Sequence, residues 1–151
     1  MSDTIDGLWQ FVVFRLHARE YALPVGQVVE VLHMVAMTPL PEAPAWLPGV
    51  IDLRGQVIPI LDLRTRLGLR PQAPDLDTAI VVVDADGRIL GLIADAVVEI
   101  LTFPPESIAP PGALAGSTHT IAGVACVGGR LIMIFDVHAL YPGAESMLPA
   151  A

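Results

Sequence analysis

The feature that most restricts the fold is an internal repeat in the sequence. A shift of 69 positions places 28–32 (VVEVL) on 97–101 (VVEIL), and a shift of 74 positions places 60–63 (ILDL) on 134–137 (IFDV). Self-similarity at a long period indicates repeated structural units. The sequence therefore predicts two similar units in tandem, at about 7–70 and 76–141.

Each unit consists of short apolar runs that are rich in Val and Ile and are separated by turn residues. In the first unit the expected strands are 8–16, 20–23, 27–32, 50–53 and 57–61. Four apolar residues of 25–32 also have helical spacing. The β-branched residues and the alternation in this segment favour a short turn that leads into a strand. Many short strands separated by turns are typical of small β-barrels, so the predicted fold class is all-β.

The runs 50–53 and 57–61 flank the pair Arg54-Gly55, which predicts a β-hairpin with Arg54 at its exposed tip. Pro59 has no N–H to donate, so its strand is expected at a sheet edge or at a bulge. The second copy has Gly128 at the position that matches Arg54, so this turn does not require an arginine. Arg54 is therefore the candidate functional residue of the first copy. The alternative is an arginine that the hairpin tip merely tolerates.

Composition limits the classes of partner. The 151 residues are 54% hydrophobic and only 16% charged, and the net charge is −8. A chain with this charge repels nucleic-acid phosphates. Because no apolar run reaches the roughly 20 residues that a membrane-spanning helix needs, no membrane insertion is expected. The single cysteine suits a reducing cytoplasm. The apolar surface that such a chain must expose is either scattered or gathered into patches for protein partners.

No motif predicts catalysis, a metal site or a cofactor. The four histidines lack the spacing of metal ligands. Cys126 lies in an apolar run, where a buried, inert thiol is expected. Asp84 and Asp86 surround Gly87 in the manner of a hairpin tip and supply too few oxygen ligands for a calcium loop. Asp62 and Asp136 match under the repeat, which indicates a structural role such as capping a turn.

Several motifs along the chain match one known family. They are 21–24 (YALP), 28–32 (VVEVL), 40–44 (LPEAP), 49–55 (GVIDLRG), 57–64 (VIPILDLR), 91–99 (GLIADAVVE) and 130–132 (RLI). Through them the sequence resembles the CheW family, the coupling proteins of bacterial chemosensory arrays, over residues 8–141. It departs from the family at Asp52, where Asn is usual. This carboxylate lies two positions from Arg54 and is expected to compete for its guanidinium.

The resemblance implies a fold that agrees with the repeat. It predicts a single CheW-like domain over 8–141, built from two five-stranded SH3-like β-barrels with short helical connections. Residues 1–6 and 142–151 lie outside the match and are expected to be flexible.

The resemblance also implies a function. The chain would be a non-enzymatic cytoplasmic adaptor at receptor arrays on the inner face of the membrane. It would couple the hairpin tips of chemoreceptors (methyl-accepting chemotaxis proteins) to the regulatory domain of a CheA-type histidine kinase. Receptors would dock between the barrels, and the kinase on an end of the first barrel. The alternatives are an adaptor of a pilus-motility or surface-sensing pathway, and a module that binds a small molecule between the barrels.

The candidate receptor and kinase contacts follow from the same resemblance and from the repeat. They are Glu30, Arg54, Val25, Val28, Val29, Leu53, Gly55, Val97 and Val98. Glu30 and Arg54 are expected to form an ion pair. Glu99, which matches Glu30, would face Gly128, so this pair is expected in the first copy alone. Some of the valines are expected to be partly exposed for the receptor.

Overall fold

A computed structural model describes residues 4–5, 7–110 and 121–139. Nearly all of its regular structure is β-strand. The strands are β1 (Thr4–Ile5), β2 (Leu8–Leu16), β3 (Arg19–Pro24), β4 (Val28–His33), β5 (Gly49–Leu53), β6 (Gln56–Asp62), β7 (Ala79–Ala85), β8 (Arg88–Ala94), β9 (Ala96–Phe103), β10 (Ile108–Ala109), β11 (Ile121–Val127) and β12 (Arg130–Phe135). The helical segments are η1 (Val25–Gln27), α1 (Leu63–Arg66), η2 (Pro105–Ser107) and η3 (Val137–Ala139). The predicted all-β class with short helical connections is confirmed.

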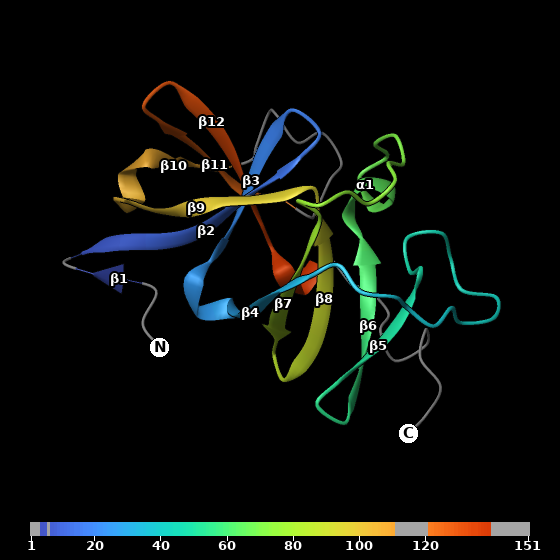
Figure 1. The fold of residues 1–151 in the computed structure, drawn as a ribbon. Helices are drawn as coiled ribbons and strands as arrows, with labels where there is room; N and C mark the ends of the chain where they lie inside the picture. The colour runs from blue at the N-terminus through green and yellow to red at the C-terminus, as the bar shows by residue number, and fades with distance from the viewer. Residues whose placement is uncertain (1–3, 6, 111–120, 140–151) are drawn as a thin grey trace.

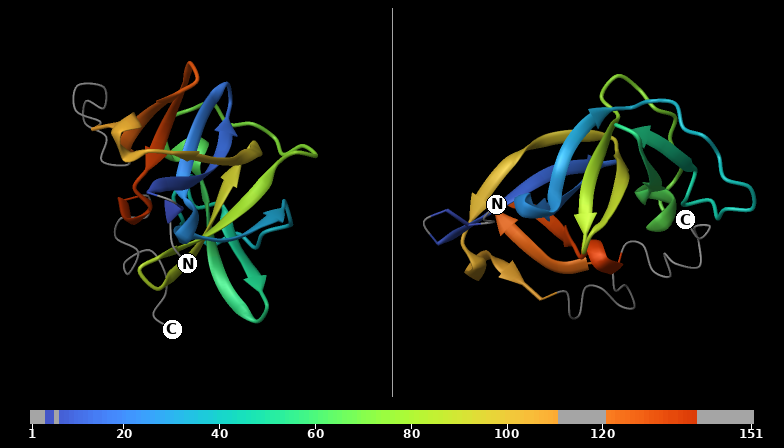
Figure 2. Two further views of the ribbon diagram at one scale, coloured as in Figure 1. Left: turned by 90° about the vertical axis from the view of Figure 1, so that its left-hand side faces the viewer. Right: turned by 90° about the horizontal axis from the view of Figure 1, so that it is seen from below.

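The strands form two sheets (Figure 1). One is a five-stranded sheet with the order β4-β7-β8-β6-β5. The other is a seven-stranded sheet with the order β1-β2-β3-β12-β11-β10, in which β9 pairs with β2. In Figure 1 the five-stranded sheet occupies the lower right and the seven-stranded sheet the upper left, and the two further views in Figure 2 show the same separation.

The repeat is visible in the order of the strands. Without the two-residue strands β1 and β10, the seven-stranded sheet reads β9-β2-β3-β12-β11. Under the shifts of 69 and 74, these strands match β4-β7-β8-β6-β5 of the other sheet one by one. Each sheet therefore contains one five-stranded unit of the predicted kind.

The predicted boundaries of the two units, 7–70 and 76–141, are wrong. The hairpin β2–β3 pairs with β9 and β12 from the second half of the chain, and β7–β8 pairs with β4 and β6 from the first half. The two copies have exchanged their first hairpins. The exchange is possible because the matched hairpins have similar apolar patterns, so either copy can fill the same place in either sheet. Sequence position alone cannot assign them.

The ends of the chain were expected to be flexible. Thr4 and Ile5 pair with Trp9 and Leu8 to form β1. Residues 1–3 and 6 lie outside the described residues. Residues 142–151 lie outside the described residues.

Pro59 lies in β6, which has β5 on one side and β8 on the other. The parallel pairing with β8 begins at Ile60, one residue after the proline. The predicted edge or bulge is therefore wrong, because β6 lies inside the sheet and its pairing with β5 runs through Val50 and Pro59 without a shift. The proline is accommodated because it lies just before the ladder to β8 begins.

Among the residues that the structure describes, the buried apolar side chains form three cores. One lies within the seven-stranded sheet around Phe11 and Ile132, and one within the five-stranded sheet around Ile58 and Ile80. The largest core joins the sheets. From the seven-stranded sheet it contains the stacked rings of Phe14, Tyr21 and Phe135, and from the five-stranded sheet it contains Leu61, Val81, Val83, Leu90 and Leu92. The two sheets thus share one interior.

Gly49 and Gly123 match under the repeat and have the same packing role. A Cβ atom at Gly49 would lie 2.6 Å from the carbonyl oxygen of Thr38, which forms an isolated bridge with Val50. A Cβ atom at Gly123 would lie 2.7 Å from the Ile108 Cγ2 atom. In both copies a glycine lets a neighbouring segment lie close to the hairpin.

The Gly49→Ala variant is expected to be less stable by about 1–3 kcal/mol, because the new methyl group meets a backbone oxygen that cannot turn aside. This corresponds to a melting temperature several degrees lower. Gly123→Ala is the matched control and should cost less, since its nearest neighbour is a side-chain methyl. Calorimetry that finds the two variants equally stable would contradict this account.

Candidate functional site

The candidate site is built where β4 approaches the tip of the β5–β6 hairpin. The hairpin ends in a two-residue turn with φ of 53° at Arg54 and 84° at Gly55. Positive φ at both residues defines the type I′ turn that suits two-residue hairpins. The Asp52 Oδ1 atom accepts a hydrogen bond of 2.8 Å from the Gly55 N–H. The predicted competition of Asp52 for Arg54 is therefore wrong, because Asp52 is occupied in bracing the turn.

The Arg54 guanidinium makes a two-pronged contact with the Glu30 carboxylate. Its Nη2 atom donates to Glu30 Oε1 at 2.9 Å, and its Nη1 atom donates to Glu30 Oε2. The arginine side chain is 71% exposed, whereas that of Glu30 is 22% exposed. The predicted ion pair is confirmed. An exposed pair contributes little to stability, so its main physical effect is to hold the planar guanidinium at a defined place on the surface.

The ion pair also changes the acidity of Glu30. Hydrogen bonds from Arg54 lower the pKa of the Glu30 carboxyl below its usual value of 4.5. A carboxyl with a lowered pKa in the folded state stabilises the protein above its unfolded pKa, and this stabilisation is lost as the pH falls through the folded pKa.

We expect Arg54→Ala to raise the pKa of Glu30 toward 4.5, because the hydrogen bonds that stabilise the carboxylate disappear. An NMR titration of the glutamate carboxyl carbons measures this value directly. Glu20, whose pKa is lowered by its hydrogen bonds with Arg130, is the internal control and should not move. A Glu30 pKa that is the same in both proteins would show that the pair does not form in solution.

The second copy has an ion pair of its own, contrary to the prediction. Glu99 lies 3.1 Å from the Nη1 atom of Arg130, and the Nη2 atom of Arg130 lies 2.6 Å from Glu20 Oε2. Arg130 follows the Gly128-Gly129 turn, whereas Arg54 forms part of its own turn. The second copy thus supplies the cation from the other side of the hairpin. The arginine there is 35% exposed, half as much as Arg54.

The five predicted valine contacts are all accessible to some degree. Val29 is 51% exposed, and Val25, Val28, Val97 and Val98 are half-buried. The matched pair Val28 and Val97 packs against the core between the sheets, and Val98 packs against the core of the seven-stranded sheet. The expectation that some of these side chains are partly exposed is confirmed.

The remaining two candidates lie in the hairpin itself. Leu53 is half-buried and packs against the core of the five-stranded sheet, and Gly55 is exposed in the turn. The structure brings Glu30, Leu53, Arg54 and Gly55 together at the hairpin tip. Val97 and Val98 lie apart from them, in β9 of the seven-stranded sheet.

Sequence reasoning missed four exposed apolar side chains, which lie in β4, β6, β9 and β12. Val31 and Ile100 match under the repeat, as do Val57 and Leu131, and the latter two are 68% and 60% exposed. The signal was present, because each pair is apolar in both copies. It was not decisive, because a shared apolar residue is equally typical of a core position.

Cys126 was expected to be buried, but it is exposed. The strand alternates between its two faces, and Cys126 falls on the outer face, at the position that matches Asp52. The predicted capping roles are confirmed. The Asp62 Oδ1 atom accepts from the Arg64 N–H at 3.0 Å, and the Asp136 Oδ1 atom accepts from the His138 N–H at 3.1 Å.

Asp84 braces the β7–β8 turn by accepting from the Gly87 N–H at 2.7 Å, as expected for a hairpin tip. Within the part of the chain that the structure describes, no three His, Cys, Asp or Glu side chains are grouped as metal ligands would be. No helix among these residues is long and apolar enough to cross a membrane.

The family model of the CheW-like domain matches residues 10–145. The chain belongs to this family. It is 33% identical over 142 residues to the chemotaxis protein CheW of Rhizobium meliloti (strain 1021), and this match covers 93% of this chain and 92% of the relative. It is 34% identical over 99 residues to protein PilI of Pseudomonas aeruginosa, and this match covers 66% of this chain and 56% of the relative.

Among solved structures, the scaffolding protein TtCheW from Thermoanaerobacter tengcongensis is similar to this chain. The TM-score is 0.83 and the identity 35%, and the match covers 87% of this chain and 86% of that chain. The likeness of fold thus extends over both sheets of the CheW-like domain.

Proposed function

We propose that this CheW-like protein is a non-enzymatic adaptor that couples chemoreceptors to a CheA-type histidine kinase. The observation that carries the proposal is the family match over residues 10–145, at about a third identity to a chemotaxis protein CheW along almost the whole of both chains. The protein would act in the cytoplasm, at receptor arrays on the inner face of the membrane.

The arrangement of the candidate residues supports this role. Arg54 stands out from the turn and is held there by Glu30, which accepts from two of its N–H groups; the other three of the five remain for carboxylates or carbonyl oxygens of a partner. Valines on both sheets remain partly exposed beside the shared core. In the proposal, the receptor hairpin lies between the sheets against these valines, and the kinase regulatory domain docks at an end of the five-stranded sheet.

Binding to purified partners tests the proposal. Isothermal titration calorimetry with a receptor-tip fragment and with the kinase regulatory domain should give two separate sites, and addition of the chain should let receptors stimulate the kinase. Binding of neither fragment, together with a signal from a panel of metabolites, would favour the small-molecule sensor instead. A pull-down from the native cell that recovers receptors and kinase of a pilus-motility pathway would favour the adaptor of that pathway.

Val29→Arg is expected to weaken receptor binding about tenfold while the melting temperature changes little, because the exposed valine can be replaced by a charge without unfolding the protein. Leu76→Arg, at a side chain 97% exposed in the connection before β7, is the matched control and should bind normally. Val28→Arg should instead lower the melting temperature, since Val28 packs against the shared core. Receptor affinity unchanged in Val29→Arg would remove this valine from the contact.

A further inference from the structure

A buried cluster of charges lies where the chain crosses between the sheets. Asp95 stands between β8 of the five-stranded sheet and β9 of the seven-stranded sheet. Its N–H donates to the Arg15 carbonyl oxygen at 2.9 Å, and its Oδ2 atom accepts from the His17 N–H at 2.6 Å. Both acceptor and donor belong to the β2–β3 hairpin. Asp95 is therefore tied to the seven-stranded sheet by two hydrogen bonds.

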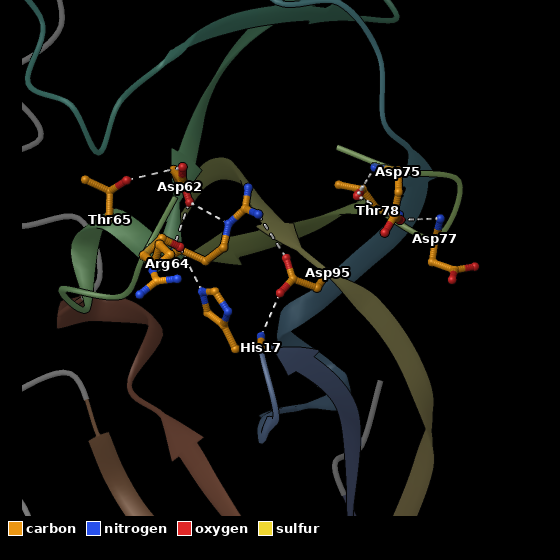
Figure 3. A network of polar contacts seen from close by, with 9 residues as sticks. His17, Asp62, Arg64, Thr65, Asp75, Asp77, Thr78 and Asp95 are labelled. Atoms are coloured by element: carbon orange, nitrogen blue, oxygen red, sulfur yellow. Dashed lines mark hydrogen bonds and ion pairs between the residues drawn. The ribbon is translucent and has the colours of Figure 1, made fainter. Parts of the chain in front are cut away.

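The opposite charge comes from the other sheet. Arg64 lies in α1, directly after β6, and is only 3% exposed. Its Nη1 atom lies 3.1 Å from Asp95 Oδ1, and its Nε atom lies 3.3 Å from Asp62 Oδ1 (Figure 3). Arg64 Nη1 and Asp95 Oδ1 are close but are not aligned as a hydrogen bond, so their attraction is mainly electrostatic. The contact joins the two sheets through a charge pair shielded from water.

The internal repeat provides an independent comparison. Positions 64 and 17 correspond to His138 and Asp86 in the second copy. The His138 Nδ1 atom lies 3.0 Å from Asp86 Oδ2, and these residues again come from different sheets, His138 from the segment after β12 and Asp86 from the β7–β8 turn. In the first copy, the His17 Nε2 atom lies 2.8 Å from the Arg70 carbonyl oxygen. In both copies the residue at this turn position, His17 or Asp86, thus contacts the segment that follows a strand of the other sheet, at Arg70 or at His138.

We propose that Arg64 and Asp95 form a latch that fixes the orientation of the two sheets, and that they are positioning residues for the receptor. The proposal rests on the proposed function, in which the receptor contacts both sheets and the kinase only one. The shared core is built of aliphatic and aromatic side chains, whose attraction has no direction. The pair of Arg64 and Asp95 is different, because Asp62 holds the arginine and the His17 N–H holds the aspartate, so the two charges meet in only one orientation of the sheets.

A role in orientation differs from a role in stability. Replacing both members of a buried ion pair by apolar residues is often neutral for stability, whereas removing one member leaves an uncompensated charge. The double variant Arg64→Met/Asp95→Leu therefore separates the two roles. Asp95→Asn retains the shape and the acceptor for the His17 N–H and leaves Arg64 still paired with Asp62. It serves as a second variant if the double variant does not fold, and its melting temperature is measured alongside to show what the loss of one charge costs.

Double electron–electron resonance measures the distribution of distances between two spin labels, one on each sheet, and so reports how the sheets are oriented. Cys126 in β11 is exposed and carries one label, and a Val57→Cys substitution in β6 of the other sheet carries the second. We expect a narrow distance distribution in the parent protein and a broader one in both latch variants. The control Asp86→Ala, which removes the solvent-exposed contact of His138 with Asp86 between the sheets, should broaden the distribution less.

The same variants are tested for binding. We expect receptor-fragment affinity to fall about tenfold in the latch variants and kinase-domain affinity to stay at the parent value. A distance distribution as narrow as in the parent protein overturns the latch, as does equal loss of both affinities. If the parent protein binds no receptor fragment, the proposed function fails, and the spin-label distances still decide whether the latch exists.

Discussion

The Arg54→Ala variant is expected to lose most receptor-stimulated kinase activity while its melting temperature stays within a few degrees of the parent value. The side chain is 71% exposed and its one described partner, Glu30, lies on the same surface, so little packing is lost. The residue at this position has a φ of 53°, a value that favours glycine, and the matching residue in the second copy is Gly128. An arginine in a backbone conformation that favours glycine indicates that its side chain has a function other than forming the turn.

The size of the effect follows from the chemistry of the guanidinium. Truncating an arginine at the centre of an interface often reduces affinity at least about tenfold. Arg54→Lys should restore only part of the activity, because a point charge cannot reproduce the planar fork.

Arg54→Gly is the matched control for the backbone, since glycine suits the turn. It should fold at least as well as the alanine variant and be equally inactive. Kinase activation at the parent level by either variant, at equal protein concentration, would remove Arg54 from the functional site.

The second large effect is expected from Phe14→Ala, which should destabilise the whole domain by about 3–5 kcal/mol. Phe14 is fully buried, and its ring lies 5.8 Å from that of Phe135 and 6.2 Å from that of Tyr21, centre to centre. These rings form the side of the shared core that faces the five-stranded sheet. The loss should lower the melting temperature by roughly 10 °C.

Because the sheets share this core and exchange hairpins, the variant should still unfold in one transition. Trp9 packs against the core of the seven-stranded sheet and Trp46 against the shared core, so two variants with one tryptophan each report on different regions. Coincident fluorescence and circular-dichroism transitions in both are the expected result. Separate transitions would mean that the sheets are independent units.

Much of the local structure could be predicted from the sequence. Strand β2 was expected at the residues where it lies, and the β5–β6 hairpin was expected with Arg54 and Gly55 as its turn. These successes have one cause: alternating or continuous apolar runs and a glycine in a two-residue turn are local signals. The Glu30–Arg54 pair was inferred from a resemblance to the CheW family, and the contact is present.

The errors concern which face or which neighbour a residue meets. Cys126 was assigned to the interior because its run is apolar, but strand alternation turns it outward. Glu99 was thought to lack a cation because Gly128 replaces Arg54. Arg130, two positions further along, lies close enough to pair with it. In both cases a shift of one or two positions along a strand decides the environment of a side chain.

The sequence by itself determined that this chain is all-β, that it contains two copies of one unit, and where most strands and turns begin. Only the tertiary structure decided how the strands are grouped. The parallel pairs β6–β8 and β3–β12 join residues far apart in the chain, and matched hairpins have the same apolar pattern, so nothing local distinguishes the exchanged arrangement from a sequential one. The choice is made by the packing of both sheets on one shared core, to which residues from the whole chain contribute at once.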